Sequence, residues 1–202
     1  MARPRAFDEE QVLDAAMHAF RRTGFRDTSV VDLEAATGLR ASSLYQAFGD
    51  KTGLFRRALE HYLAVLVTPR LDRFAGPDAG PDDLEQLFTS LFHPPYDDGY
   101  GCLLVNSAAE FGGSDAVPGD RVREGLDLVQ RRFEDVVRRS APGATRTQVR
   151  TEAARLVLAY HGVLLLSRAG RLGPTHRAAV RAELDSLRAL ARGTAPTQEE
   201  PS

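Results

Sequence analysis

Long proline-free stretches, in which apolar residues recur at helical spacing, lie between the 11 prolines of this chain. Isoleucine is absent, and the good helix formers Ala, Leu, Arg and Glu dominate the composition. No segment of alternating apolar and polar residues is joined to a hairpin turn. The sequence therefore predicts an all-α fold of about nine helices.

The composition excludes several classes of protein. The 202 residues are 43% apolar, but the longest apolar runs are far shorter than the roughly 20 residues that cross a membrane. The single cysteine, Cys102, cannot form an internal disulfide, and the N-terminal segment lacks the apolar stretch of a signal peptide. A net charge of −2 does not favour binding of polyanions by bulk charge. We therefore expect a soluble, cytoplasmic protein that does not associate with membranes.

The residues that catalytic and metal sites require do not come together in the sequence. The 5 histidines share no metal-ligand spacing with one another or with Cys102. No Gly-x-Ser-x-Gly or Walker pattern is present, and Gly99 and Gly101 supply only half of a dinucleotide-binding fingerprint. The sequence therefore predicts that the protein is not an enzyme and needs no metal or cofactor.

The segment 29–48 has the pattern of two short helices joined by a tight turn at Gly38. Such a helix-turn-helix unit can place its second helix in the major groove of DNA. The side chains expected to face the core are Val30, Leu33, Ala36, Leu44 and Phe48. The second helix then exposes a small, polar surface with one arginine, formed by Arg40, Ala41, Ser42, Ser43, Tyr45 and Gln46. On the pattern alone, DNA binding and mere packing of a helix pair are about equally well supported.

Several short runs in and around this unit belong together: Phe20-Arg-Arg-Thr-Gly-Phe25, Thr28-Ser-Val30, Thr37-Gly-Leu39, the run 43–51 and Leu54-Phe55. Together they resemble the tetracycline-repressor (TetR) family of bacterial transcriptional regulators over about residues 6–65. The segment 101–107 is also similar to one branch of that family. The resemblance implies a homodimer with N-terminal three-helix DNA-binding heads and a divergent C-terminal helical domain. The domains are expected at 1–50 and 51–192, and a disordered tail at 193–202.

The resemblance also implies roles for individual residues of the head. Tyr45 and Lys51 would contact phosphates, and Thr28 would cap its helix and touch the DNA backbone. Arg40 would be the best candidate for reading a guanine, but it stands where the family often has Ser or Thr as the helix cap. The expected DNA-binding residues are Thr28, Ser29, Arg40, Ala41, Ser42, Ser43, Tyr45, Gln46 and Lys51.

The C-terminal region supplies many aromatic residues, and the resemblance implies a ligand cavity between the fourth and seventh helices. The candidates for ligand binding or sensing are Cys102, Tyr62, Leu66, Phe88, Phe92, Asn106 and His161. Two interpretations of Cys102 stay open: an electrophile-sensing thiol at the first turn of a helix, or a small core hydrophobe. The last two long helices, which contain Leu158 and Leu187, are expected to form the dimer seam.

The predicted function is a dimeric transcriptional repressor of an inverted-repeat operator in double-stranded DNA. A small molecule or an electrophile, not identified by the sequence, would release it. One alternative is a transcriptional activator, which the sequence does not distinguish from a repressor. The other is a helical small-molecule-binding protein without DNA function, against which the intact Tyr45 and Lys51 argue.

Overall fold

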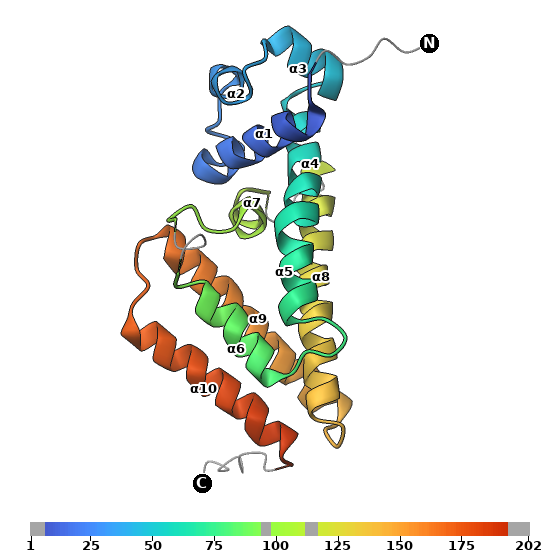
Figure 1. The fold of residues 1–202 in the computed structure, drawn as a ribbon, viewed down its shortest axis with the longest axis vertical. Helices are drawn as coiled ribbons and strands as arrows, with labels where there is room; N and C mark the ends of the chain where they lie inside the picture. Colours follow the sequence, from blue (N-terminus) through green and yellow to red (C-terminus); the bar gives the residue numbers. More distant parts are fainter. Residues whose placement is uncertain (1–6, 94–97, 112–116, 194–202) are drawn as a thin grey trace. The chain divides into compact units, whose positions relative to one another are not determined.

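The computed structural model describes residues 7–93, 98–111 and 117–193. All regular elements in these ranges are helical (Figure 1), which confirms the predicted all-α fold. In chain order they are α1 (Glu9–Thr23), α2 (Val30–Thr37), α3 (Ala41–Phe48), α4 (Lys51–Tyr62), η1 (Leu63–Val67), α5 (Thr68–Phe74), α6 (Pro81–Ser90), α7 (Leu103–Phe111), α8 (Val117–Ser140), α9 (Arg146–Arg168) and α10 (Pro174–Ala191). Because α4, η1 and α5 follow one another without a break, the described ranges hold the predicted nine helical runs. The predicted disordered tail lies outside the described residues, except for Gly193.

The chain divides into two compact units, and the predicted domain boundary at residue 50 stays a prediction. Unit 1 comprises Met1–Thr68 and Cys102–Leu126, and unit 2 comprises Pro69–Gly101 and Asp127–Ser202. Helix α4 belongs to unit 1, where it packs against α1, α3 and α7. The three helices of the predicted head therefore share a compact unit with α4 and α7.

Helix α1 begins directly after its N-cap residue, Asp8. The Asp8 side chain caps it by accepting hydrogen bonds from the backbone N–H groups of Glu10 and Gln11 at 3.0 and 3.4 Å. Its apolar stripe is buried and consists of Val12, Leu13, Ala16, Met17 and Phe20. These side chains pack α1 against α2 and α4 and form the core of unit 1.

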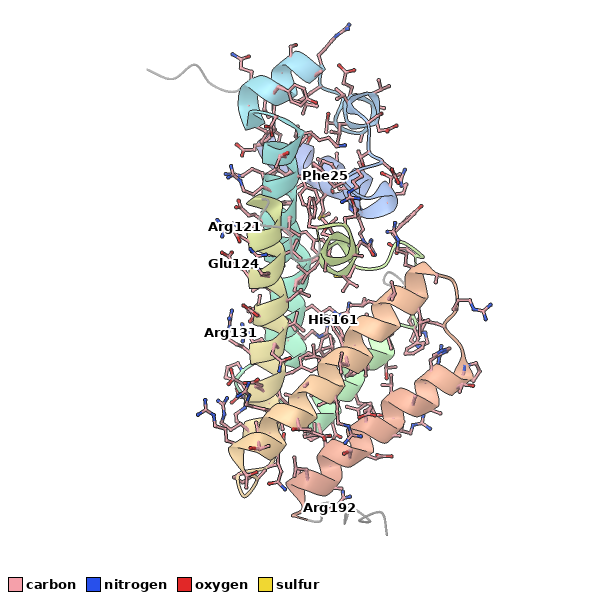
Figure 2. All side chains as sticks on the ribbon, turned by 180° about the vertical axis from the view of Figure 1, so that it is seen from behind. Phe25, Arg121, Glu124, Arg131, His161 and Arg192 are labelled. Carbon is pink, nitrogen blue, oxygen red and sulfur yellow. The ribbon has the colours of Figure 1, made fainter. Side chains whose placement is uncertain are left out.

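A cluster of four phenylalanine rings extends this core. Phe20, Phe25, Phe55 and Phe111 come from α1, the α1–α2 connection, α4 and α7, and neighbouring ring centroids are 5.0 to 6.2 Å apart. Figure 2 labels Phe25 among the side chains of this unit. Ring contacts of this kind add about 0.5–1.5 kcal/mol each to the burial of the rings. They fix the α1–α2 connection, which is not helical itself, to the core.

The helical run that begins at Lys51 passes through Pro69 and ends at Phe74. A proline inside a helix lacks the N–H donor, and its ring clashes with the carbonyl group four residues earlier. The π-helical segment η1 ends at Val67, two residues before Pro69, and the N–H of Thr68 bonds the carbonyl of Leu63, five residues back. This wider turn accommodates the proline, so the helical run passes through it.

Unit 2 is built around α6, α9 and α10, which lie side by side in Figure 1. The rings of Phe88, Phe133 and Tyr160 meet in its core with centroids 5.5 to 6.3 Å apart. Leu187 is fully buried inside this unit. The expectation that Leu187 lies in a seam between two chains is therefore wrong, because the α10 stripe packs within its own chain.

Candidate DNA-binding site

The predicted helix-turn-helix unit is present as α2 and α3, and each helix has a defined start. Ser29 caps α2: its hydroxyl accepts the N–H of Asp32 at 3.2 Å, and the Asp32 carboxylate accepts the N–H of Ser29 at 2.8 Å. The hydrogen bonds from the Ser29 side chain and backbone lower the pKa of the Asp32 carboxyl. Helix α2 ends at Gly38, whose left-handed φ of 70° permits the tight turn.

The core-facing residues of this unit are mostly those that the spacing predicts. Leu33 and Leu44 are fully buried, and Val30 and Phe48 are half-buried. Ala36 is exposed, which corrects its assignment to the core. Leu33 is the one residue of α2 that is buried.

The start of α3 depends on a residue that the sequence analysis missed. Arg40 occupies the N-cap position, and its side chain makes no capping hydrogen bond. Instead, the carboxylate of Glu34 on α2 accepts the backbone N–H of Ala41, the first residue of α3, at 2.7 Å. No local capping pattern covers a spacing of seven residues, so only the folded arrangement of α2 and α3 identifies this contact.

The residues predicted to contact DNA are all in unit 1, and most of them reach the surface. Ser29, Arg40, Ser42 and Gln46 are exposed, whereas Ala41, Ser43, Tyr45 and Lys51 are half-buried. Among the described residues, the Arg40 guanidinium has no hydrogen bond or ion pair, so all its donors are available to a ligand. The polar face that the sequence predicts on α3 is therefore present.

Two of the predicted contacts have partners inside the protein. The Lys51 ammonium donates to the carbonyl oxygen of Arg26 at 3.3 Å and lies 4.7 Å from the centre of the Phe25 ring. Thr28 is fully buried, and its hydroxyl bonds the Gly24 carbonyl and the Thr23 hydroxyl. The prediction that Thr28 caps α2 is wrong, because Ser29 is the residue whose oxygen faces the first-turn N–H groups.

The α1–α2 connection is held by a carboxylate that the sequence analysis also missed. The two oxygens of Glu110, on α7, accept the backbone N–H groups of Phe25 and Arg26, each at 2.9 Å. The Arg26 guanidinium returns a hydrogen bond to the Glu110 carbonyl at 3.0 Å. Gly24 has a φ of 88°, and a Cβ atom there would stand 2.3 Å from a Glu110 oxygen, so this position requires glycine.

Four of the ligand or sensor candidates lie in unit 1. Cys102 is buried directly before α7, and the Tyr62 hydroxyl donates to its sulfur at 3.2 Å. Asn106, also buried, donates its side-chain amide to the carbonyl of Arg21 at the end of α1. Leu66 is half-buried in η1. Asn106 and Tyr62 therefore have structural partners in this unit.

The other three candidates lie in unit 2. Phe88 is fully buried in the aromatic core, and the Arg177 guanidinium lies 4.7 Å from the centre of the Phe92 ring. His161 is half-buried on α9, and its Nε2 atom is buried with no hydrogen-bond partner among the residues that the structure describes. Burial lowers the pKa of its imidazole. The prediction that these residues share a ligand cavity with those of unit 1 stays a prediction.

Two further features of the described residues bear on function. Within the ranges that the structure describes, no group of three or more His, Cys, Asp or Glu side chains could hold a metal ion. No helix in these ranges is both long enough and apolar enough to cross a membrane.

Comparison with known proteins places this architecture among regulators. Residues 12–58 match the model of a family described as bacterial regulatory proteins, tetR family. The sequence is 44% identical to the HTH-type transcriptional repressor ComR of Escherichia coli over 73 residues. This alignment covers 36% of this chain and 31% of ComR. The sequence is also 41% identical to the HTH-type transcriptional repressor BdcR of Escherichia coli over 70 residues, an alignment that covers 35% of this chain and 36% of BdcR. The chain thus aligns with about a third of the length of these curated relatives.

The likeness to solved structures extends over nearly the whole chain. A cysteine-substituted variant of the TetR-family transcriptional regulator CifR, complexed with 26-base-pair double-strand operator DNA, superposes with a TM-score of 0.76 and 27% sequence identity. That match covers 91% of this chain and 99% of the CifR chain.

Proposed function

Since this chain belongs to the TetR family of bacterial regulatory proteins, we propose that it is a transcriptional repressor that binds double-stranded operator DNA as a homodimer. The observation that carries the proposal is the exposed polar face of α3, next to a capped α2 and a tight glycine turn. In a helix-turn-helix protein, the second helix reads base edges from this face.

Three of the predicted DNA-binding residues, Arg40, Tyr45 and Lys51, have roles that their positions support. Arg40 stands at the start of α3 with its guanidinium free to make two hydrogen bonds to one guanine. Tyr45 presents a phenolic hydroxyl, and Lys51 a positive charge, and both suit phosphate oxygens. Lys51 retains two donors beyond the one it gives to Arg26, so it can bind a phosphate without leaving its place.

The homodimer is supported by an apolar face on α9. Leu158 is 73% exposed and Leu165 is 53% exposed. Gly162 lies between them on the same side of the helix, and outside its own stretch of helix no atom of the described residues lies within 4 Å of the place where its Cβ would stand. A second copy of this chain would cover the two leucines by packing its own α9 against them, and two heads would then bind two half-sites of an inverted repeat.

Release by a small molecule or an electrophile completes the proposal. Asn106 and Glu110 lie four residues apart on α7, and Cys102, directly before this helix, lies four residues before Asn106. Asn106 and Glu110 bond backbone groups at the end of α1 and in the α1–α2 connection. A reaction at the Cys102 sulfur, or displacement of the Tyr62 hydroxyl from it, would therefore act on α7. This helix holds the end of α1 and the α1–α2 connection, which leads into the helix-turn-helix unit.

The proposal is tested by selecting a duplex from a random pool with the wild-type protein and then measuring its affinity at several salt concentrations. We expect an inverted repeat to be recovered. Lys51→Ala should weaken binding to all sequences and reduce the salt slope by about one unit per head. Arg40→Ala should instead relax the preference at one base pair of each half-site, by about 1–3 kcal/mol.

A matched control is Arg131→Ala, which removes the same charge from an exposed side chain of α8 in unit 2 (Figure 2). It should leave the salt slope at the wild-type value. If no duplex is recovered, or if Lys51→Ala and Arg131→Ala behave alike, the proposed placement of the head on DNA is wrong.

A further inference from the structure

Helix α3 lacks the features that usually start a short helix. Its first turn contains no acidic residue, and Arg40 gives it no side-chain cap. The first N–H groups of a helix have no partner within the helix, and a helix of eight residues is only marginally stable by itself. An acceptor from elsewhere in the protein is therefore needed to define where α3 begins.

Glu34 supplies this acceptor and also holds the other end of the turn. Its side-chain oxygen accepts the N–H of Ala41 at 2.7 Å, and its backbone carbonyl accepts the N–H of Gly38 at 2.9 Å. The two bonds bracket residues 38–40, so one residue of α2 fixes both the end of its own helix and the start of the next. A carboxylate at this position also interacts favourably with the partial positive charge of the α3 N-terminus.

The contact also explains how Arg40 can occupy the N-cap position. Its backbone has the extended conformation of a cap, with φ −71° and ψ 149°, while its side chain is exposed and unbonded in the described part of the chain. Because Glu34 does the capping, the residue at this position does not have to be Ser or Thr. The long side chain at the start of α3 is thereby available for base contacts.

We propose that Glu34 is a positioning residue for DNA recognition, whose side-chain oxygen sets the start of α3 and so the place from which Arg40 reaches the bases. This inference rests on the proposed function, since it concerns the selectivity of the same DNA-binding face. A residue 1 Å out of place loses a two-bond contact to a base, whereas phosphate contacts tolerate the same shift. Loss of the Glu34 contact should therefore reduce operator binding more than binding to unrelated DNA.

The experiment compares Glu34→Gln with Glu34→Ala. Both variants remove the negative charge, which by itself would strengthen binding to any DNA, but only glutamine keeps an oxygen that can accept the Ala41 N–H. We measure affinities for the duplex selected by wild type and for a scrambled duplex, together with hydrogen exchange of the Ala41 amide. The expected result is an operator affinity about five- to tenfold lower for Glu34→Ala than for Glu34→Gln. Their affinities for the scrambled duplex should agree, and only Glu34→Ala should lose protection of the Ala41 amide.

Three outcomes would overturn the inference. Equal operator affinities of the two variants would show that the acceptor has no role in recognition. Equal losses on operator and scrambled DNA, together with a lower Tm, would show that Glu34 supports only the fold. Unchanged exchange of the Ala41 amide in Glu34→Ala would show that the contact does not hold the start of α3. Failure of the wild type to select any duplex is a separate result that refutes the proposed function, and the exchange measurement then still decides whether Glu34 caps α3.

Discussion

Replacing Glu110 with alanine removes two hydrogen bonds that join α7 to the α1–α2 connection. The N–H groups of Phe25 and Arg26 each lose an acceptor at 2.9 Å. The group at Phe25 is partly buried, so water replaces its partner incompletely, whereas the group at Arg26 is exposed and recovers much of the loss. Hydrogen bonds to a charged acceptor contribute about 1.5–3 kcal/mol when buried and less at the surface. We expect Glu110→Ala to lower the free energy of unfolding by about 2 kcal/mol.

The consequence reaches beyond stability because this connection leads directly into α2. With its two N–H groups released, the connection still has the Phe25 ring contacts and the Lys51 bond to the Arg26 carbonyl. The Arg26 guanidinium also still has the backbone carbonyl of residue 110, which alanine retains, so the expected effect is loosening of the connection and not its complete release. The assay is urea or thermal unfolding combined with hydrogen exchange at the Phe25 and Arg26 amides. For a chain of this length, a loss of about 2 kcal/mol corresponds to roughly 4–8 °C in Tm.

Two further variants make the measurement specific. Glu110→Gln keeps one acceptor oxygen and should lie between wild type and Glu110→Ala. Glu124→Ala removes the same charge from an exposed carboxylate that pairs only with surface arginine Arg121 in the described residues (Figure 2). It should cost no more than about 0.5 kcal/mol. The reasoning is refuted if Glu110→Ala and Glu124→Ala have the same Tm, or if the two amides exchange in Glu110→Ala as they do in wild type.

Two other predictions concern unit 2. Leu158→Glu should place an unpaired carboxylate in the proposed dimer face and give monomers in light scattering with a nearly unchanged Tm, whereas Leu187→Glu should lower the Tm because Leu187 is fully buried within one chain. A dimeric Leu158→Glu protein would rule out the α9 face. Burial raises the pKa of the Glu152 carboxyl, and the charge of Arg155 offsets part of this shift. The folded state therefore binds the Glu152 proton more tightly than the unfolded state does. The stability that this proton binding contributes is lost as the pH rises through the folded-state pKa. Glu152→Gln should therefore raise the Tm near neutral pH and give a smaller gain at about pH 4; an equal gain at both values would contradict this assignment.

The features of the head that the sequence predicted are those that local patterns determine. The capping position of Asp8, the buried stripe of α1 and the two short helices on either side of Gly38 depend on residues within a few positions of one another. Pro69 illustrates the limit of a local rule, because the helical run passes through this proline on a wider helical turn that removes the clash. Thr28 and Ser29 both suit a cap, and the choice between them depends on which one points at the first turn.

The contacts that hold the head together could not be predicted in this way. Glu34 bonds Ala41, which lies seven positions later in the sequence. Glu110 bonds Phe25 and Arg26, which lie 85 and 84 positions before it, so neither contact follows a helical or capping period. The ligand-binding residues could not be predicted reliably from the sequence either, because the same spacing of aromatic and apolar residues is typical of a packed core and of a cavity. Phe88 illustrates it, because its ring is fully enclosed by Phe133 and Tyr160 and other core side chains.

The hydrogen bonds of the Glu34 and Glu110 carboxylates also reduce the unfavourable effect that their negative charges would have on DNA binding. A negative charge near a DNA-binding face weakens the attraction to phosphates, and unpaired glutamates there would reduce affinity for every sequence. Glu34 and Glu110 instead direct their charge at backbone N–H groups, which partly neutralise it and which would otherwise lack an acceptor. Their effect on DNA binding is therefore expected in the geometry of α3 and of the α1–α2 connection rather than in the net charge. This is why glutamine, which keeps the oxygen and loses the charge, is the informative substitution at both positions.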